Sequence, residues 1–227
     1  MAVITIAREM GSEGDVLGLE LADTLGYAFL NKEIIHRVAD RMGSSDEEIE
    51  QYDEKTDNWL IRILTQTFAS HPDMAAYYST FAYVEPTYVY GVAEPYVYYQ
   101  VPPGRTKEVD PEKVRKNFEA IIREAAAKGN IVIVGRASQC ILKDMPGAFH
   151  LRTVAPLDWR IRNVVRDNPD LSNEDAAELI NRNDKWRERY LAVNYREDWH
   201  NPLLYHAILS MDKWNRAKLL DFVKCGA

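Results

Sequence analysis

The sequence predicts an α/β fold in which a parallel sheet is covered by helices on both faces. Two short β-branched runs, at residues 3–7 and 131–134, are each followed by a glycine-bearing turn. Runs of this kind are typical of strands that are buried on both faces. Helical patterns separate the strand candidates along the chain, and this alternation calls for a parallel sheet with right-handed crossover connections.

The N-terminal segment is predicted to run from strand to loop to helix. The strand at residues 3–7 leads into a glycine-bearing loop at residues 8–14. Leucines then repeat every four residues from Leu17 to Leu25, and Gly26 stands at the expected C-cap. This order is the opening of a nucleotide-binding α/β fold. The next expected elements are a strand at residues 27–30, a helix at 31–43 and a helix that Ser45 and Glu48 cap.

The second half of the chain continues the alternation of strands and helices. Its clearest helix begins at Asp110 and Pro111, carries one apolar stripe, and ends at Gly129. The expected elements after the strand at 131–134 are a strand at 148–154, helices at 156–167 and 172–190, a strand at 206–209 and a helix at 214–223.

The segment at residues 71–104 interrupts this rhythm. It holds eight of the 13 tyrosines and five prolines, and we interpret it as an insertion into one domain that spans residues 1–227. Three interpretations stay open: private packing against the core, a wall on which a base stacks, or an oligomer interface. Because so much tyrosine would otherwise leave a large apolar patch exposed, we expect a homodimer that forms through residues 71–104.

Composition limits the class of protein. The net charge is −7 over 227 residues, which argues against a nucleic-acid polymer as partner. No apolar run approaches 18 residues and no secretory leader is evident, so we expect a cytoplasmic protein without a membrane partner. Cys140 and Cys225 cannot form a disulfide framework and are expected to be reduced thiols.

The loop at residues 8–14 is the first candidate site. A phosphate-binding P-loop has the pattern G-x-x-x-x-G-K-[ST] between a strand and a helix, and it binds through backbone N–H groups and the helix N-terminus. The context is right, but Gly14 occupies the lysine position and Asp15 the Ser/Thr position, while Arg8 and Glu13 replace the signature glycines. On these letters alone, an ordinary turn is an equally good interpretation.

Arginines of the second half form the other candidates. One predicted helix carries Arg160, Arg162 and Arg166, and the next carries Arg182, Arg187 and Arg189. Guanidinium groups clamp a phosphoryl group in transfer, but arginines beside acidic residues also form ordinary solvated faces. Arg136 directly follows a strand, where ligands of open α/β sheets bind, and a structural arginine is the alternative.

Three stretches together resemble the cytidylate kinase-like family of P-loop nucleoside monophosphate kinase relatives. They are ITIAREMGSEGDVLGLELADTLGYAFLNKEII, GNIVIVGRASQCILKDMPGAFHLRTVAPLDWRIRNVV and AELINRNDKWRERYLAVNYREDWHNPLLYHAILSMDKW. The resemblance implies a three-layer parallel sheet of P-loop nucleotide kinase type with a helical lid at about residues 160–200. It leaves the Tyr-rich insertion unmatched.

The resemblance also implies roles for individual residues. The residues that it assigns to the donor nucleotide, ATP or another nucleoside triphosphate, are Gly11, Ser12, Gly14 and Arg160. The residues that it assigns to the acceptor nucleotide are Asn31, Lys32, Arg37 and Arg136. The residues that match the R-x-D-x-x-R-x-R run of the lid helix, and so act in phosphoryl transfer, are Arg182, Asp184, Arg187 and Arg189. As lid residues, Arg182 and Arg187 are expected to be exposed.

Two departures from the family pattern affect the expected activity. Asp15 stands where relatives have a basic residue, and Glu13 replaces a loop glycine. Two carboxylates beside a triphosphate repel it by about 1–4 kcal/mol each, although Asp15 can also serve as a Mg²⁺ ligand. Because the loop has no lysine, Arg8 is the loop cation that we expect to reach the donor phosphates. We therefore expect a cytidylate-type nucleotide kinase that uses a nucleoside triphosphate and Mg²⁺, with a catalytically weak or inactive nucleotide-binding protein as the alternative.

Overall fold

The computed structural model describes residues 2–31 and 111–226. The chain divides into two compact units. The first consists of residues 1–31 and 128–227, and the second of residues 32–127. Most of helix α5 (Pro111–Lys128), which matches the helix expected there, belongs to the second unit. Its buried residues are Phe118, Ile121, Ile122, Ala125 and Ala126. The helices expected from residue 31 onward and the insertion at 71–104 lie outside the described residues.

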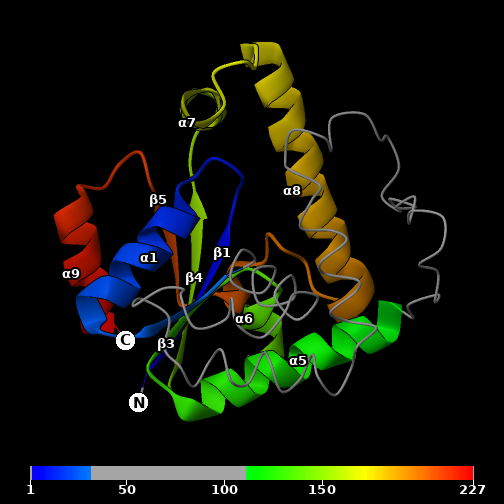
Figure 1. Ribbon diagram of the computed structural model, residues 1–227, viewed down its shortest axis with the longest axis vertical. Coiled ribbons are helices and arrows are strands. Elements are labelled where there is room, and N and C mark those ends of the chain that lie inside the picture. Colours follow the sequence, from blue (N-terminus) through cyan, green and yellow to red (C-terminus); the bar gives the residue numbers. More distant parts are fainter. Residues whose placement is uncertain (1, 32–110, 227) are drawn as a thin grey trace, which may run out of the picture. The chain divides into compact units, whose positions relative to one another are not determined.

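The first unit is built on a five-stranded sheet whose strands are all parallel (Figure 1). The strand order is β2-β3-β1-β4-β5, so the N-terminal strand lies at the centre. The strand bounds are β1 Val3–Arg8, β2 Ala28–Leu30, β3 Ile131–Val134, β4 Ala148–Val154 and β5 Ala207–Ser210. The predicted parallel α/β sheet is confirmed, and every expected strand within the described residues is present.

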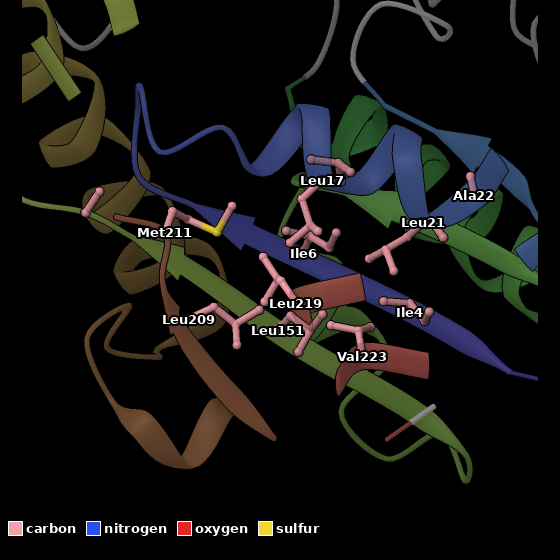
Figure 2. Packing of buried hydrophobic residues seen from close by; sticks show 13 residues of the cluster. Ile4, Ile6, Leu17, Leu21, Ala22, Leu151, Leu209, Met211, Leu219 and Val223 are labelled. Carbon is pink, nitrogen blue, oxygen red and sulfur yellow. The ribbon is translucent and has the colours of Figure 1, made fainter. Parts of the chain in front are cut away.

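One face of the sheet is covered by α1 (Gly14–Leu25) and α9 (Arg216–Gly226). Side chains alternate between the faces of a strand, so Ile4 and Ile6 of β1 both point to this face. They pack with Leu17 of α1 and Leu219 of α9, each at most 1% exposed (Figure 2). Burying one such side chain contributes about 1.5–3 kcal/mol, so the isoleucines that β1 presents to this face stabilise the layer.

The opposite face is covered by the short helix α6 (Ser138–Ile141) and the C-terminal part of α8 (Asn173–Tyr195). Ala7 of β1 packs there with Cys140, Leu191 and Trp199. Helices thus cover both faces, as expected. The sequence pattern placed the end of α8 near Tyr190, but the helix continues to Tyr195 because Leu191 is buried in this second cluster.

The remaining helices of the first unit are α7 (Leu157–Asp167) and a 3₁₀ turn at Pro202–Leu204. Helix α7 agrees with its predicted range, whereas the four-residue helix α6 was not expected. None of the helices in the described ranges combines the length and apolar character needed to cross a membrane.

The register of the sheet brings three turns to one edge. Arg8 at the end of β1 lies opposite Thr153 of β4, and Ile6 lies opposite Val134 of β3. The loop after β1, the turn at Gly135 and the end of β4 therefore lie at the same carboxyl edge. Ligands of open α/β sheets bind beyond this edge.

Candidate functional site

The loop between β1 and α1 is held in place by β4 and α7. The Ser12 hydroxyl, which is fully buried, donates to the Glu9 carbonyl at 2.8 Å and contacts the Thr153 hydroxyl at 2.8 Å. The Asn163 amide of α7 donates to the carbonyl of Gly11 at 2.9 Å. The Ser12 N–H also bonds to the Glu9 carbonyl, so Ser12 supports the loop from within.

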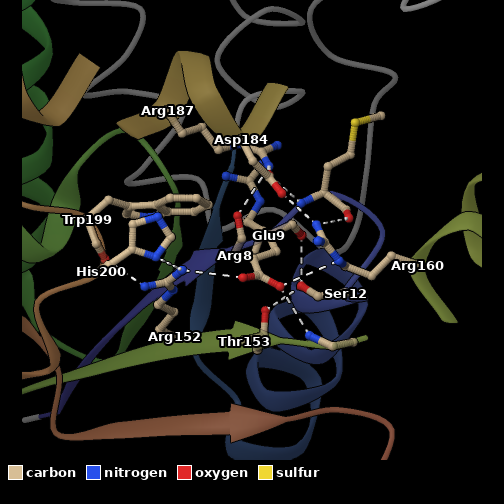
Figure 3. Close-up of polar contacts among 12 residues, drawn as sticks. Arg8, Glu9, Ser12, Arg152, Thr153, Arg160, Asp184, Arg187, Trp199 and His200 are labelled. Atoms are coloured by element: carbon tan, nitrogen blue, oxygen red, sulfur yellow. Dashed lines mark hydrogen bonds and ion pairs between the residues drawn. The ribbon is translucent and has the colours of Figure 1, made fainter. Parts of the chain in front are cut away.

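Asp184 of α8 links the loop to two helices (Figure 3). Its Oδ1 accepts the backbone N–H of Met10 at 2.9 Å and an Nη1–H of Arg187 at 3.0 Å. Its Oδ2 accepts from Nη1 of Arg160 of α7 at 2.5 Å. Arg187 also donates to the carbonyl of Arg8 at 3.2 Å, so residues far apart in sequence form one charged cluster.

A second carboxylate, Glu9, supports the cluster from the side of β4. It accepts the backbone N–H of Ala155 at 3.2 Å and forms ion pairs with Arg152 at 3.4 Å and Arg160 at 3.5 Å. Arg152 is only 3% exposed; it donates to the Trp199 carbonyl at 2.8 Å, and its guanidinium lies 4.4 Å from the Trp199 ring centroid. Cation–π contact and charge-assisted hydrogen bonds compensate such a buried cation.

The acidic residues of the loop are each paired with arginine. Asp15 accepts from Nε of Arg8 at 2.9 Å. Glu13 accepts from Arg166 at 2.9 Å and from Arg216 at 2.8 Å. The repulsion that two free carboxylates would exert on a phosphate is therefore reduced in this arrangement.

Two of these guanidiniums have shifted pKa values. Burial, followed by the nearby charge of Arg8, lowers the pKa of Arg187 to about 10. Arg187 still carries its charge at neutral pH. The hydrogen bonds that Arg166 donates to Asp167, and then to Glu13, raise the pKa of Arg166.

The structure brings most of the predicted site residues together. The loop contributes Arg8, Gly11, Ser12, Gly14 and Asp15, and the helices contribute Arg160, Asp184 and Arg187. The expectation that Arg182 and Arg187 are exposed was wrong, because both are half-buried. Arg187 is held by Asp184 and by the backbone of Arg8, which explains its burial.

The remaining predicted residues differ in exposure and position. Arg189 is exposed. Arg162 is also exposed and pairs with Asp158 one turn away, which agrees with the interpretation of Arg162 as part of a solvated charged face. Arg136 is half-buried in the turn after β3 with φ +55°, and Asn31 follows β2. Lys32 and Arg37 lie outside the described residues.

Sequence reasoning missed Glu9, Arg152 and the ring of Trp199. A signal for Arg152 was present, because it interrupts an otherwise buried strand, AFHLRTV. A charged residue in such a strand needs a partner. No comparable signal marked Glu9, whose partners are distant in sequence.

The donor set for Mg²⁺ is limited. Within the described part of the chain, no three acidic, histidine or cysteine side chains gather as metal ligands. Asp15 is half exposed and is engaged by Arg8, so it fits the ion as a single ligand at most. Mg²⁺ commonly binds through one carboxylate and the phosphates of its substrate, and Asp15 fits that pattern.

The parallel sheet and the loop after its central strand define a nucleotide kinase-like α/β fold. The chain belongs to the cytidylate kinase-like family, whose profile matches residues 3–213.

The chain is similar to several proteins, among them one curated relative and one solved structure. A cytidylate kinase of Methanosarcina barkeri (strain Fusaro / DSM 804) is 23% identical over 125 residues, which cover 53% of this chain and 67% of the relative. The crystal structure of an uncharacterized protein from Eubacterium ventriosum ATCC 27560 superposes with a TM-score of 0.63 at 18% identity, covering 99% of this chain and 97% of that one. The second comparison shows a shared fold.

Proposed function

We propose that this protein is a nucleoside monophosphate kinase that transfers a phosphoryl group from ATP, or another nucleoside triphosphate, to cytidylate. One observation carries the proposal. Arginines from β1, α7 and α8 converge on the loop after the central strand, and Asp184 joins two of them to the loop backbone. Phosphoryl transfer depends on positioning and charge neutralisation, which such a cluster supplies.

The donor phosphates would lie over residues 11–14 and the N-terminus of α1. Backbone N–H groups and the helix dipole favour negative charge there. Arg160 and Arg187 would neutralise charge on the transferring group, and Asp184 would orient both guanidiniums. Asp15 would hold Mg²⁺ that is bound to the nucleotide, and the ion would supply further neutralisation of phosphate charge.

The acceptor would bind at the carboxyl edge beside the donor. Arg136 follows β3 and Asn31 follows β2, the two strands next to β1 on that side of the sheet. Family resemblance adds Lys32 and Arg37. The cytidylate kinase of Methanosarcina barkeri supports cytidylate as the acceptor.

Initial rates of ADP release with each of the four common ribonucleoside monophosphates test this function. We expect the highest kcat/KM with CMP. Arg187→Lys retains the charge but loses the planar fork, so its kcat should fall at least about tenfold, which corresponds to 1.4 kcal/mol. The matched control Arg162→Lys, at an exposed arginine, should leave kcat unchanged. No preference among the acceptors, or equal rates for Arg187→Lys and wild type, would contradict the assignment.

A nucleotide-binding protein without turnover is the second candidate. It is favoured by the observation that Arg8, Arg160 and Arg187 already have carboxylate partners. A triphosphate must compete with these carboxylates, and the loop has no lysine to help it. Measurable ATP affinity without ADP release for any acceptor would support this candidate. The cytoplasmic location and the homodimer stay predictions.

A further inference from the structure

Arg8 uses little of its hydrogen-bonding capacity. A guanidinium has five N–H donors. Nε of Arg8 donates to Asp15 at 2.9 Å, but neither Nη atom has an acceptor among residues 2–31 and 111–226. The side chain as a whole is only 16% exposed, so a ligand at the loop can reach these donors without a large movement of Arg8.

Two glycines make room for this side chain. A Cβ added at Gly14, the first residue of α1, would lie 2.6 Å from Cβ of Arg8. A Cβ at Gly135, after β3, would overlap Nη1 of Arg8. Any larger residue at Gly135 would thus displace the guanidinium from its place between the loop and the end of β3.

A second cation lies next to Arg8. Arg187 donates to the Arg8 carbonyl, and the charge of Arg8 is one cause of its lowered pKa. Two guanidiniums that repel each other in a half-buried position are stabilised when an anion binds both. Asp184 already pairs with Arg187 at 3.0 Å, whereas the carboxylate that contacts Arg8 is Asp15, whose side chain is 49% exposed and can give way to another anion.

We propose that Arg8 binds the nucleotide phosphates in place of the P-loop lysine, and that Asp15 is its exchangeable counter-ion. The inference rests on the proposed nucleotide-binding function. The ligand class is a polyphosphate, whose oxygens would take the Nη donors of Arg8. The exposed Asp15 carboxylate would then leave Arg8, for solvent when no metal is present and for Mg²⁺ when the nucleotide carries the ion. Asp15 thereby holds the guanidinium over the loop until a phosphate replaces it.

Titration calorimetry with inorganic tripolyphosphate tests the proposal on the full chain, without metal and at constant ionic strength. Arg8→Gln should weaken binding at least about tenfold, because a hydrogen bond to a charged group contributes about 1.5–3 kcal/mol. Asp15→Asn should tighten binding about fivefold, because it removes the repulsion between the carboxylate and the phosphate, and two unit charges 4 Å apart in water interact by about 1 kcal/mol. The control Arg162→Gln, which removes an exposed arginine with one carboxylate partner, should change affinity less than about twofold.

A double-mutant cycle separates exchange from simple repulsion. If Asp15 acts as the counter-ion of Arg8, the gain from Asp15→Asn should be smaller in the Arg8→Gln background. An equal gain in both backgrounds, weaker binding by Asp15→Asn, or wild-type affinity in Arg8→Gln would each overturn the proposal. Absence of tripolyphosphate binding by the wild-type protein would overturn it as well.

Far-UV circular dichroism identifies a variant that fails to fold. If Arg8→Gln does not fold, Arg8→Lys takes its place in the titration. The lysine keeps the charge without the planar fork, so this variant should retain part of the tripolyphosphate affinity. Full wild-type affinity in Arg8→Lys would count against a specific role for the guanidinium. The test is separable from the kinase assignment. Arg8-dependent tripolyphosphate binding without turnover would leave this inference standing while the kinase activity fails.

Discussion

Glu13 offers a test in which backbone strain and charge pairing oppose each other. This residue directly precedes α1 with φ 57° and ψ 24°, a left-handed conformation that costs a non-glycine residue roughly 1–2 kcal/mol. Its carboxylate pairs with Arg166 and Arg216, whose side chains are 55% and 31% exposed. Exposed pairs of this kind contribute about 0.2–1 kcal/mol each.

The two substitutions Glu13→Ala and Glu13→Gly therefore differ in a defined way. Glu13→Ala loses both ion pairs and keeps the strain, so the free energy of unfolding should fall by about 1 kcal/mol. Glu13→Gly loses the same pairs but relieves the strain, so it should be about 1 kcal/mol more stable than the alanine variant and close to wild type.

Urea unfolding, followed by circular dichroism, measures these differences. Each variant should keep the wild-type m-value, which shows that the midpoint shift reports stability. Glu13→Gln is the matched control: it retains size and strain but loses the charge, and it should lie between alanine and wild type. If the glycine variant is no more stable than the alanine variant, the strain argument is refuted. If the alanine variant equals wild type, the two ion pairs contribute nothing.

Three further expectations concern Arg187, His150 and the oligomeric state. Arg187→Ala should lower the free energy of unfolding by about 1–2 kcal/mol, because Asp184 and the Arg8 carbonyl lose a donor; urea unfolding showing a loss below 0.5 kcal/mol would restore the exposed-lid interpretation. Burial, and then the charge of His206, lower the pKa of His150 to about 4, so stability should fall as the pH drops from 6.5 toward 4, by up to about 3 kcal/mol. His150→Gln should flatten that part of the pH profile, and an unchanged profile would contradict it. Light scattering at tens of micromolar should give a homodimer mass, whereas a monomer would favour private packing of residues 71–104.

The sheet could be predicted from sequence because its signals are local. Runs such as Ile131–Val134 have no charged residue and end at glycine, so their burial is readable from the letters. The end of α8 was predicted less accurately. Leu191 extends the helix because it packs against Trp199 and Tyr205, which lie outside α8. Those contacts depend on the tertiary fold.

The candidate site was predictable in its residue types but not in its pairing. The R-x-D-x-x-R run placed Asp184 and Arg187 on one helix, and the resemblance attached them to phosphate. Nothing in the sequence indicated that Asp184 accepts the N–H of Met10, 174 positions away. Likewise, Glu13 was expected to repel phosphate, yet Arg166 and Arg216 pair with it because α7 and α9 approach the loop in the folded chain.

We propose that the arginine cluster at the loop supports the transfer of a phosphoryl group from ATP to a nucleotide. Anion-exchange chromatography of a reaction with ATP, Mg²⁺ and CMP tests it most directly, because it quantifies CDP and ADP in the same sample. We expect CDP and ADP to form in equal amounts, and both to fall together in Arg187→Lys. ADP without CDP, or ATP binding without either product, would contradict it.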